Sequence, residues 1–113
     1  MITVVIVDDH PIVRAGMRAV LATAGDIAIV AEGTGGADAL RLVSQHRPDV
    51  LVLDVNLPDV SGVEVTRQLH AQGATTAILI LTVYHDRETV FGLLESGAAG
   101  YVVKDDALET LVS

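Results

Sequence analysis

Carboxylates stand directly after apolar runs at two places in this 113-residue sequence. Asp8 and Asp9 follow the first run, and Asp54 follows a later one. Like charges held together either raise a pKa or recruit a cation, and oxygen donors without cysteine or paired histidine suit Mg²⁺ better than zinc. The proline and glycine of the loop after Asp54 would aim the backbone carbonyl of Asn56 inward. These residues predict a Mg²⁺ site if the fold brings them together.

Phosphoryl transfer is the chemistry that suits this set of groups. Lys104 is the only lysine of the sequence and supplies a compact positive charge, while Thr82 offers a hydroxyl donor. Phosphoryl transfer depends mainly on positioning and charge neutralisation, and a carboxylate is an established covalent acceptor. Asp54 is therefore the predicted nucleophile.

The elements that must position these residues follow a strand-helix alternation. Five short apolar runs rich in β-branched residues predict strands, at 3–7, 27–31, 50–53, 77–81 and 100–103. Their strict alternation with helical segments predicts an α/β fold with a doubly wound parallel sheet, and five strands favour the flavodoxin-like order 2-1-3-4-5. Ligands bind outside the carboxyl ends of such strands, and the first and third are then neighbours. Asp8, Asp9 and Asp54 should share one crevice.

The helical segments between the strands have recognisable ends. Pro11 suits the first turn of the first helix. The residues after it place an apolar stripe along one face of that helix. The expected stops of four helices are Gly25, Arg47-Pro48, Gly73 and Gly97. A fifth helix should begin near Asp105 or Asp106 and is cut short at Ser113.

The remaining charged side chains are interpreted as structural. Four arginines are predicted to lie on solvated helix faces: Arg14, Arg18, Arg41 and Arg67. The histidines lack the spacing of a metal site and are assigned no chemistry, with His10 and His85 at the flanks of the acidic crevice.

Composition excludes several function classes. A formal charge of −8 repels phosphate backbones, so this segment should not bind nucleic acid directly. The absence of cysteine removes disulfides, thiolate zinc sites and cysteine nucleophiles. No apolar run approaches the roughly 20 residues that span a bilayer, and no basic leader opens the chain. We expect one cytoplasmic domain over 1–113 that does not bind a membrane.

Taken together, the motifs resemble the response-regulator receiver domain of two-component signalling, over essentially the whole chain. They are Val7-Asp8-Asp9-His10, Leu53-Asp54 with Leu57-Pro58 and Gly62, Leu81-Thr82, and the run from Ala98 to Lys104. The segments 8–14 and 100–105 are similar to NarL/FixJ-type transcriptional regulators. These regulators carry a C-terminal helix-turn-helix domain, which is absent from this sequence and is expected in the full-length protein.

The resemblance implies a role for each residue of the acidic crevice. Asp54 would accept a phosphoryl group from a sensor histidine kinase. Asp9 and Asp54 would bind Mg²⁺ together with the backbone carbonyl of Asn56, and Asp8 would assist through water. The domain would assist its own phosphorylation and dephosphorylation without turning over an external substrate, so it is not expected to be an enzyme.

The resemblance also implies a switch. Lys104 and Thr82 would contact the phosphoryl group, and movement of Thr82 would let the ring of Tyr101 turn inward. This equilibrium would control dimerisation or the DNA-binding domain, with a homodimer among the expected partners and DNA bound only through the absent domain.

Three other functions remain open from the residues themselves. An aspartate-nucleophile phosphatase would use Asp54, but such enzymes usually carry an acid where Asn56 stands. A flavodoxin-like electron carrier would need a phosphate loop where Asp8 and Asp9 repel FMN. A phosphorylation-independent dimerisation module would keep the fold and predicts that Asp54→Asn leaves the output unchanged.

Overall fold

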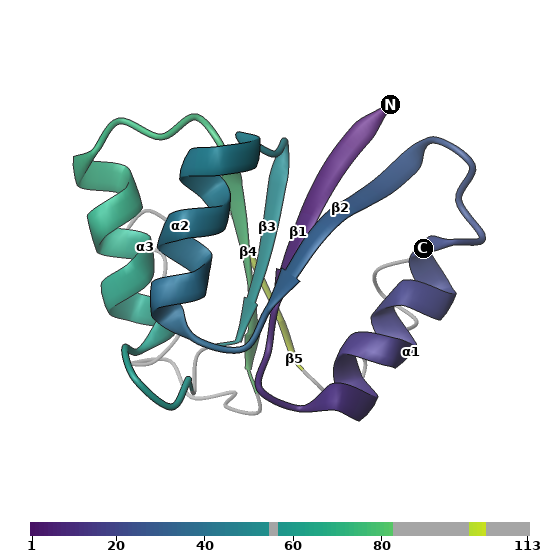
Figure 1. Ribbon diagram of the computed structural model, residues 1–113, viewed down its shortest axis with the longest axis horizontal. Coiled ribbons are helices and arrows are strands. Elements are labelled where there is room, and N and C mark those ends of the chain that lie inside the picture. Colours follow the sequence, from purple (N-terminus) through teal and green to yellow (C-terminus); the bar gives the residue numbers. More distant parts are fainter. Residues whose placement is uncertain (55–56, 83–99, 104–113) are drawn as a thin grey trace.

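The computed structural model describes residues 1–54, 57–82 and 100–103, which form a parallel sheet flanked by helices (Figure 1). The strands are β1 Ile2–Val7, β2 Ile27–Gly33, β3 Val50–Asp54, β4 Ala77–Thr82 and β5 Gly100–Val103. The helices are α1 Pro11–Leu21, α2 Gly36–His46 and α3 Gly62–Ala71. The predicted fourth and fifth helices fall outside the described residues.

The sheet has the predicted order, β2-β1-β3-β4-β5, and every neighbouring pair is parallel. The α/β fold with a doubly wound sheet is therefore confirmed. β2 is longer than its apolar run, because Glu32 and Gly33 still pair with Ile6 and Val7 of β1. Backbone pairing with a central strand thus extends β2 into polar residues.

The core lies on both faces of the sheet. Alternate residues of β1 point to opposite faces of the sheet. Val5 and Val7 pack against α2 and α3 on one face, and Val4 and Ile6 pack against α1 on the other. Figure 1 shows the same division, with α2 and α3 on one side of the sheet and α1 on the other. Two covered faces explain why the strand runs are almost continuously apolar.

The helix ends follow the expected backbone signals, with one difference. Arg47 adopts the left-handed conformation (φ 45°, ψ 56°) at the end of α2, just before Pro48, and Gly73 (φ 74°) follows α3. α1 ends at Leu21, before the expected stop at Gly25, because the turn after it is closed by the hydrogen bond from the Ala24 N–H to the Leu21 carbonyl.

The loop after β3 is attached to α2 by Asp59, a contact that the sequence did not predict. The Asp59 carboxylate accepts hydrogen bonds from the backbone N–H groups of Gly36 (2.7 Å) and Ala37 (3.1 Å) at the start of α2, and from Val60 (2.8 Å) in its own loop. The N–H groups of Ala37, Gly36 and Val60 lower the pKa of Asp59 to about 2. A carboxylate distant in sequence therefore caps α2 and complements its dipole.

We expect the stabilising effect of Asp59 to depend on pH. Its pKa is about 2 in the folded protein and about 3.9 in an unfolded chain, so its contribution is complete above about pH 4 and is lost as the pH falls towards about 2. Asp59→Asn should lower the midpoint of urea unfolding at pH 7, and the difference from wild type should shrink between about pH 4 and 2.

The matched control is Asp26→Asn, which changes an exposed carboxylate in the turn before β2. This variant should follow wild type across the same pH range. An Asp59→Asn effect of constant size from pH 7 to pH 2 would show that the charge of Asp59 is not what stabilises α2.

Candidate functional site

The predicted convergence of acidic residues is confirmed at the carboxyl ends of β1 and β3. These strands are paired, with Val7 opposite Leu53, so Asp8 and Asp54 leave the sheet side by side. Metal-ligating atoms of Asp8, Asp9, His10 and Asp54 all lie within 4.8 Å of one another. Asp8 and Asp54 are fully buried, whereas the Asp9 side chain is 34% exposed. The cluster is thus an acidic crevice with one open side.

His10 lies inside this cluster and not merely at its flank. Its Nδ1 is 2.9 Å from Oδ1 of Asp8, 3.0 Å from Oδ1 of Asp9 and 4.0 Å from Oδ2 of Asp54. Its backbone N–H also donates to Oδ1 of Asp8 at 2.8 Å. The sequence placed His10 at the flank of the crevice, and the structure places its side chain among the carboxylates.

Arg14 corrects the prediction that the helix arginines are solvated. Its side chain is only 18% exposed, its Nη1 donates to the backbone carbonyl of Asp8 at 2.6 Å, and its Nε is 3.5 Å from Oε1 of Glu32. Arg18 is half-exposed and its Nη1 lies 2.5 Å from the same Glu32 oxygen. These contacts join α1 to the ends of β1 and β2, so they fix the segment that carries the acidic pair.

The other two arginines agree with the prediction. Arg41 and Arg67 are exposed at 57% and 62%, and each pairs with an acidic residue on its own helix. Such pairs at exposed positions contribute little to stability.

The remaining predicted site residues are described only in part. Thr82 ends β4, the strand next to β3, and pairs with Val103 of β5, while Tyr101 of β5 pairs with Ile80 of β4. Both positions therefore belong to neighbouring strands near the acidic end of the sheet. Asn56, Lys104, His85 and the side chains of Thr82 and Tyr101 lie outside the described residues.

The donor set fits Mg²⁺. Two fully buried carboxylates and a partly exposed one converge, and mutual repulsion at this distance favours a bound cation. Mg²⁺ usually takes one or two protein carboxylates and keeps several waters, which the open side at Asp9 allows. These three carboxylates would hold the ion through oxygen atoms.

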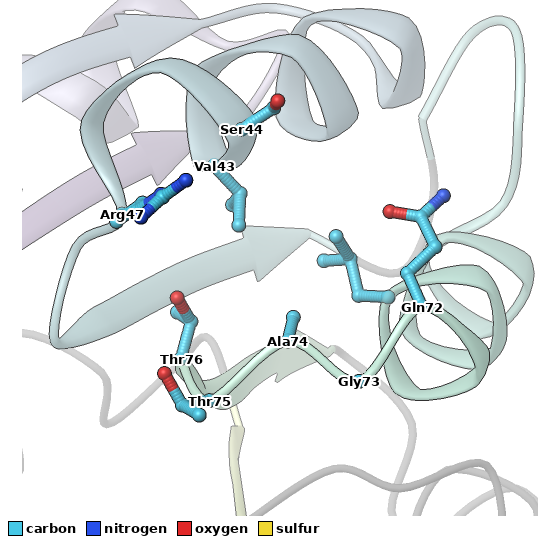
Figure 2. A pocket seen from close by; sticks show the side chains of 9 residues that line it. Val43, Ser44, Arg47, Gln72, Gly73, Ala74, Thr75 and Thr76 are labelled. Atoms are coloured by element: carbon cyan, nitrogen blue, oxygen red, sulfur yellow. The ribbon is translucent and has the colours of Figure 1, made fainter.

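A second concave feature lies at the other end of the sheet, where α2 and α3 end and β4 begins, and Figure 2 shows the side chains that line it. This open hollow of about 370 Å³ is bordered by the last turns of α2 and α3 and the segment leading into β4. Its lining is Val43, Ser44, Arg47, Leu69, Gln72, Gly73, Ala74, Thr75 and Thr76. It contains none of the predicted site residues, so the acidic crevice is the candidate site.

Comparisons with known proteins point to one family. Residues 4–113 match the model of the response regulator receiver domain. The transcriptional regulatory protein DegU of Brevibacillus brevis is 37% identical over 98% of this chain and 47% of its own length. The oxygen regulatory protein NreC of Staphylococcus epidermidis is 41% identical over 96% of this chain and 50% of its own length. The chain therefore spans about half the length of these relatives.

The solved structures agree. The signal receiver domain of the regulator NarL from Mycobacterium tuberculosis superposes with a TM-score of 0.94 at 33% identity, covering 98% of this chain and 90% of that domain. Among the helices that the structure describes, none is both long and apolar enough to cross a membrane.

Proposed function

The chain belongs to the response regulator receiver domain family, and we propose that it accepts a phosphoryl group on Asp54 with Mg²⁺ held by Asp9 and Asp54 and, through water, by Asp8. The observation that carries the proposal is the convergence of the buried Asp54 with Asp8 and Asp9 at the ends of two paired strands. We include the backbone carbonyl of Asn56 among the ligands because it follows Asp54 closely in the chain.

In the proposed transfer, a carboxylate oxygen of Asp54 forms a bond to phosphorus. The bond that breaks is the P–N bond to the donor histidine of a sensor kinase, or the P–O bond of acetyl phosphate, from which acetate leaves. Bound Mg²⁺ supplies charge neutralisation at the phosphoryl oxygens. Asp8 and Asp9 repel an incoming phosphate when the metal is absent, so this chain's acidic pair makes the transfer depend on the cation.

Lys104 and Thr82 are proposed to contact the phosphoryl group, and Thr82 with Tyr101 to act as the switch. Support comes from the sheet, where the two switch residues stand on neighbouring paired strands. A phosphoryl group can bias this pre-existing equilibrium only by the contacts that it gains in one state. The domain changes conformation and does not turn over an external substrate.

The longer relatives support a role for the full-length protein. The names of DegU and NreC describe regulatory proteins, and this chain matches about half of each. We propose a C-terminal helix-turn-helix domain that binds DNA, a sensor histidine kinase as the phosphodonor, a homodimer as an assembly form and the cytoplasm as the location.

The direct test is intact-mass measurement after incubation with acetyl phosphate, with and without Mg²⁺. Wild type and Asp26→Asn should each gain one phosphoryl adduct that requires Mg²⁺ and is removed by hydroxylamine, as expected of an acyl phosphate. Asp54→Asn should gain none. No adduct on wild type, or an adduct that persists in Asp54→Asn, would overturn the assignment of Asp54.

A turnover assay separates this function from the phosphatase alternative. A Mg²⁺-dependent phosphatase would hydrolyse many equivalents of a chromogenic phosphomonoester, whereas a phosphoacceptor switch should not. Repeated turnover by wild type that is lost in Asp54→Asn would favour the enzyme.

A further inference from the structure

We propose that His10 is a further protein ligand in the acidic crevice, and that its imidazole raises the affinity of this site for Co²⁺, Ni²⁺ or Zn²⁺ without contributing to the binding of Mg²⁺. The inference rests on the proposed function because it concerns the same metal site. It goes further by assigning a nitrogen donor to a site otherwise built from oxygen, and thereby affinity for a further class of metal ion.

The distances around His10 fit metal coordination. Adjacent ligand atoms on an octahedron with bonds of about 2.1 Å are about 3.0 Å apart, and opposite ones about 4.2 Å. Nδ1 of His10 lies 2.9 and 3.0 Å from Oδ1 of Asp8 and Asp9, and 4.0 Å from Oδ2 of Asp54. Nδ1 of His10, which contacts the carboxylates of Asp8 and Asp9 directly here, is thus close enough to all three carboxylates for one ion to bind it together with them.

The backbone holds the imidazole in this position. The N–H of His10 donates to Oδ1 of Asp8, and Pro11 opens α1 directly after it. Arg14 in turn anchors the carbonyl of Asp8. Because the segment is fixed at both ends, Nδ1 can enter a coordination sphere with little rearrangement, and the 59% exposed ring leaves the site accessible to an ion from solvent.

The donor types then determine the metal preference. Imidazole suits first-row transition metals, whose affinity for nitrogen and oxygen sites rises from Mn²⁺ towards Cu²⁺. Mg²⁺ prefers oxygen and gains little from an imidazole. Removing the imidazole should therefore weaken Ni²⁺ binding far more than Mg²⁺ binding.

The test is isothermal titration of tag-free protein with Ni²⁺ and with Mg²⁺. We expect His10→Ala to weaken Ni²⁺ binding about ten-fold or more and to change Mg²⁺ binding by less than about three-fold. His70→Ala, which removes an exposed histidine at the end of α3, should leave both affinities unchanged. Visible absorption of bound Co²⁺ provides a second readout, which should shift in His10→Ala and remain in His70→Ala.

The outcomes separate this inference from the proposed function. Equal Ni²⁺ affinities in wild type and His10→Ala, with Mg²⁺ binding intact, would overturn the role of His10 alone. Tighter Mg²⁺ binding by His10→Ala would overturn it as well, because the imidazole would then be excluding the ion from the crevice. If Asp54→Asn left Mg²⁺ binding unchanged, the proposed metal site itself would fail.

Discussion

Replacing Asp54 with Asn should stabilise the metal-free protein by about 1 to 3 kcal/mol while it abolishes phosphoryl acceptance. Asp54 is fully buried, and its carboxylate shares the crevice with those of Asp8 and Asp9. Unit charges about 4 Å apart interact by about 4 kcal/mol at an effective dielectric constant of about 20. An isosteric amide removes one charge and keeps the volume. Urea unfolding in the presence of EDTA measures the difference.

Mg²⁺ should first narrow this difference and then reverse it, because an ion at 1,000 times its dissociation constant stabilises the folded state by about 4.1 kcal/mol. At ten times its dissociation constant, an ion that binds only the folded state stabilises it by about 1.4 kcal/mol, so wild type should gain stability on titration. Asp54→Asn has lost a ligand and should gain much less, whereas Asp26→Asn should behave as wild type. If Asp54→Asn were less stable than wild type in EDTA, the carboxylate would be satisfied without a cation, and repulsion would not explain the site. Proteins commonly sacrifice stability at functional sites in this way.

The fold could be predicted from the sequence because its signals are local. Near-continuous apolar runs such as Val50 to Leu53 indicate a strand covered on both faces, and the structure buries Leu51 and Leu53 against one helical layer and Val52 against the other. Strand ends were less predictable, because β2 continues to Gly33 through pairing with β1 and not through its own composition.

The site was predictable only where topology alone decides proximity. Strand order brings Asp8 and Asp54 together whatever their side chains do. The contacts of Arg14 and Asp59 depend on side-chain direction and on loops that meet across the fold. Asp59 contacts Gly36 although the two residues are 23 positions apart in the sequence, and no local sequence pattern predicts such a cap.

Gly36→Ala should destabilise the domain by about 1 to 3 kcal/mol, although alanine is the better helix former. A Cβ at this buried position would lie 2.8 Å from Cβ of Val60, 2.9 Å from Cγ2 of Val65 and 3.0 Å from the Val60 carbonyl oxygen. Asp59 holds the N–H of Gly36 at 2.7 Å, so α2 cannot move away without losing that bond. For a domain of this size the melting temperature should fall by roughly 4 to 8 °C per kcal/mol.

Gly25→Ala is the matched control, because nothing lies within 4 Å of the Cβ it would add. It should be neutral or slightly stabilising through the unfolded state. The Gly36→Ala variant should still accept a phosphoryl group on Asp54, since it removes no group of the crevice. If the two alanine variants were equally stable, the loop after β3 would have to move aside at little cost in free energy. Its close contact with α2 would then contribute little to the stability of the domain.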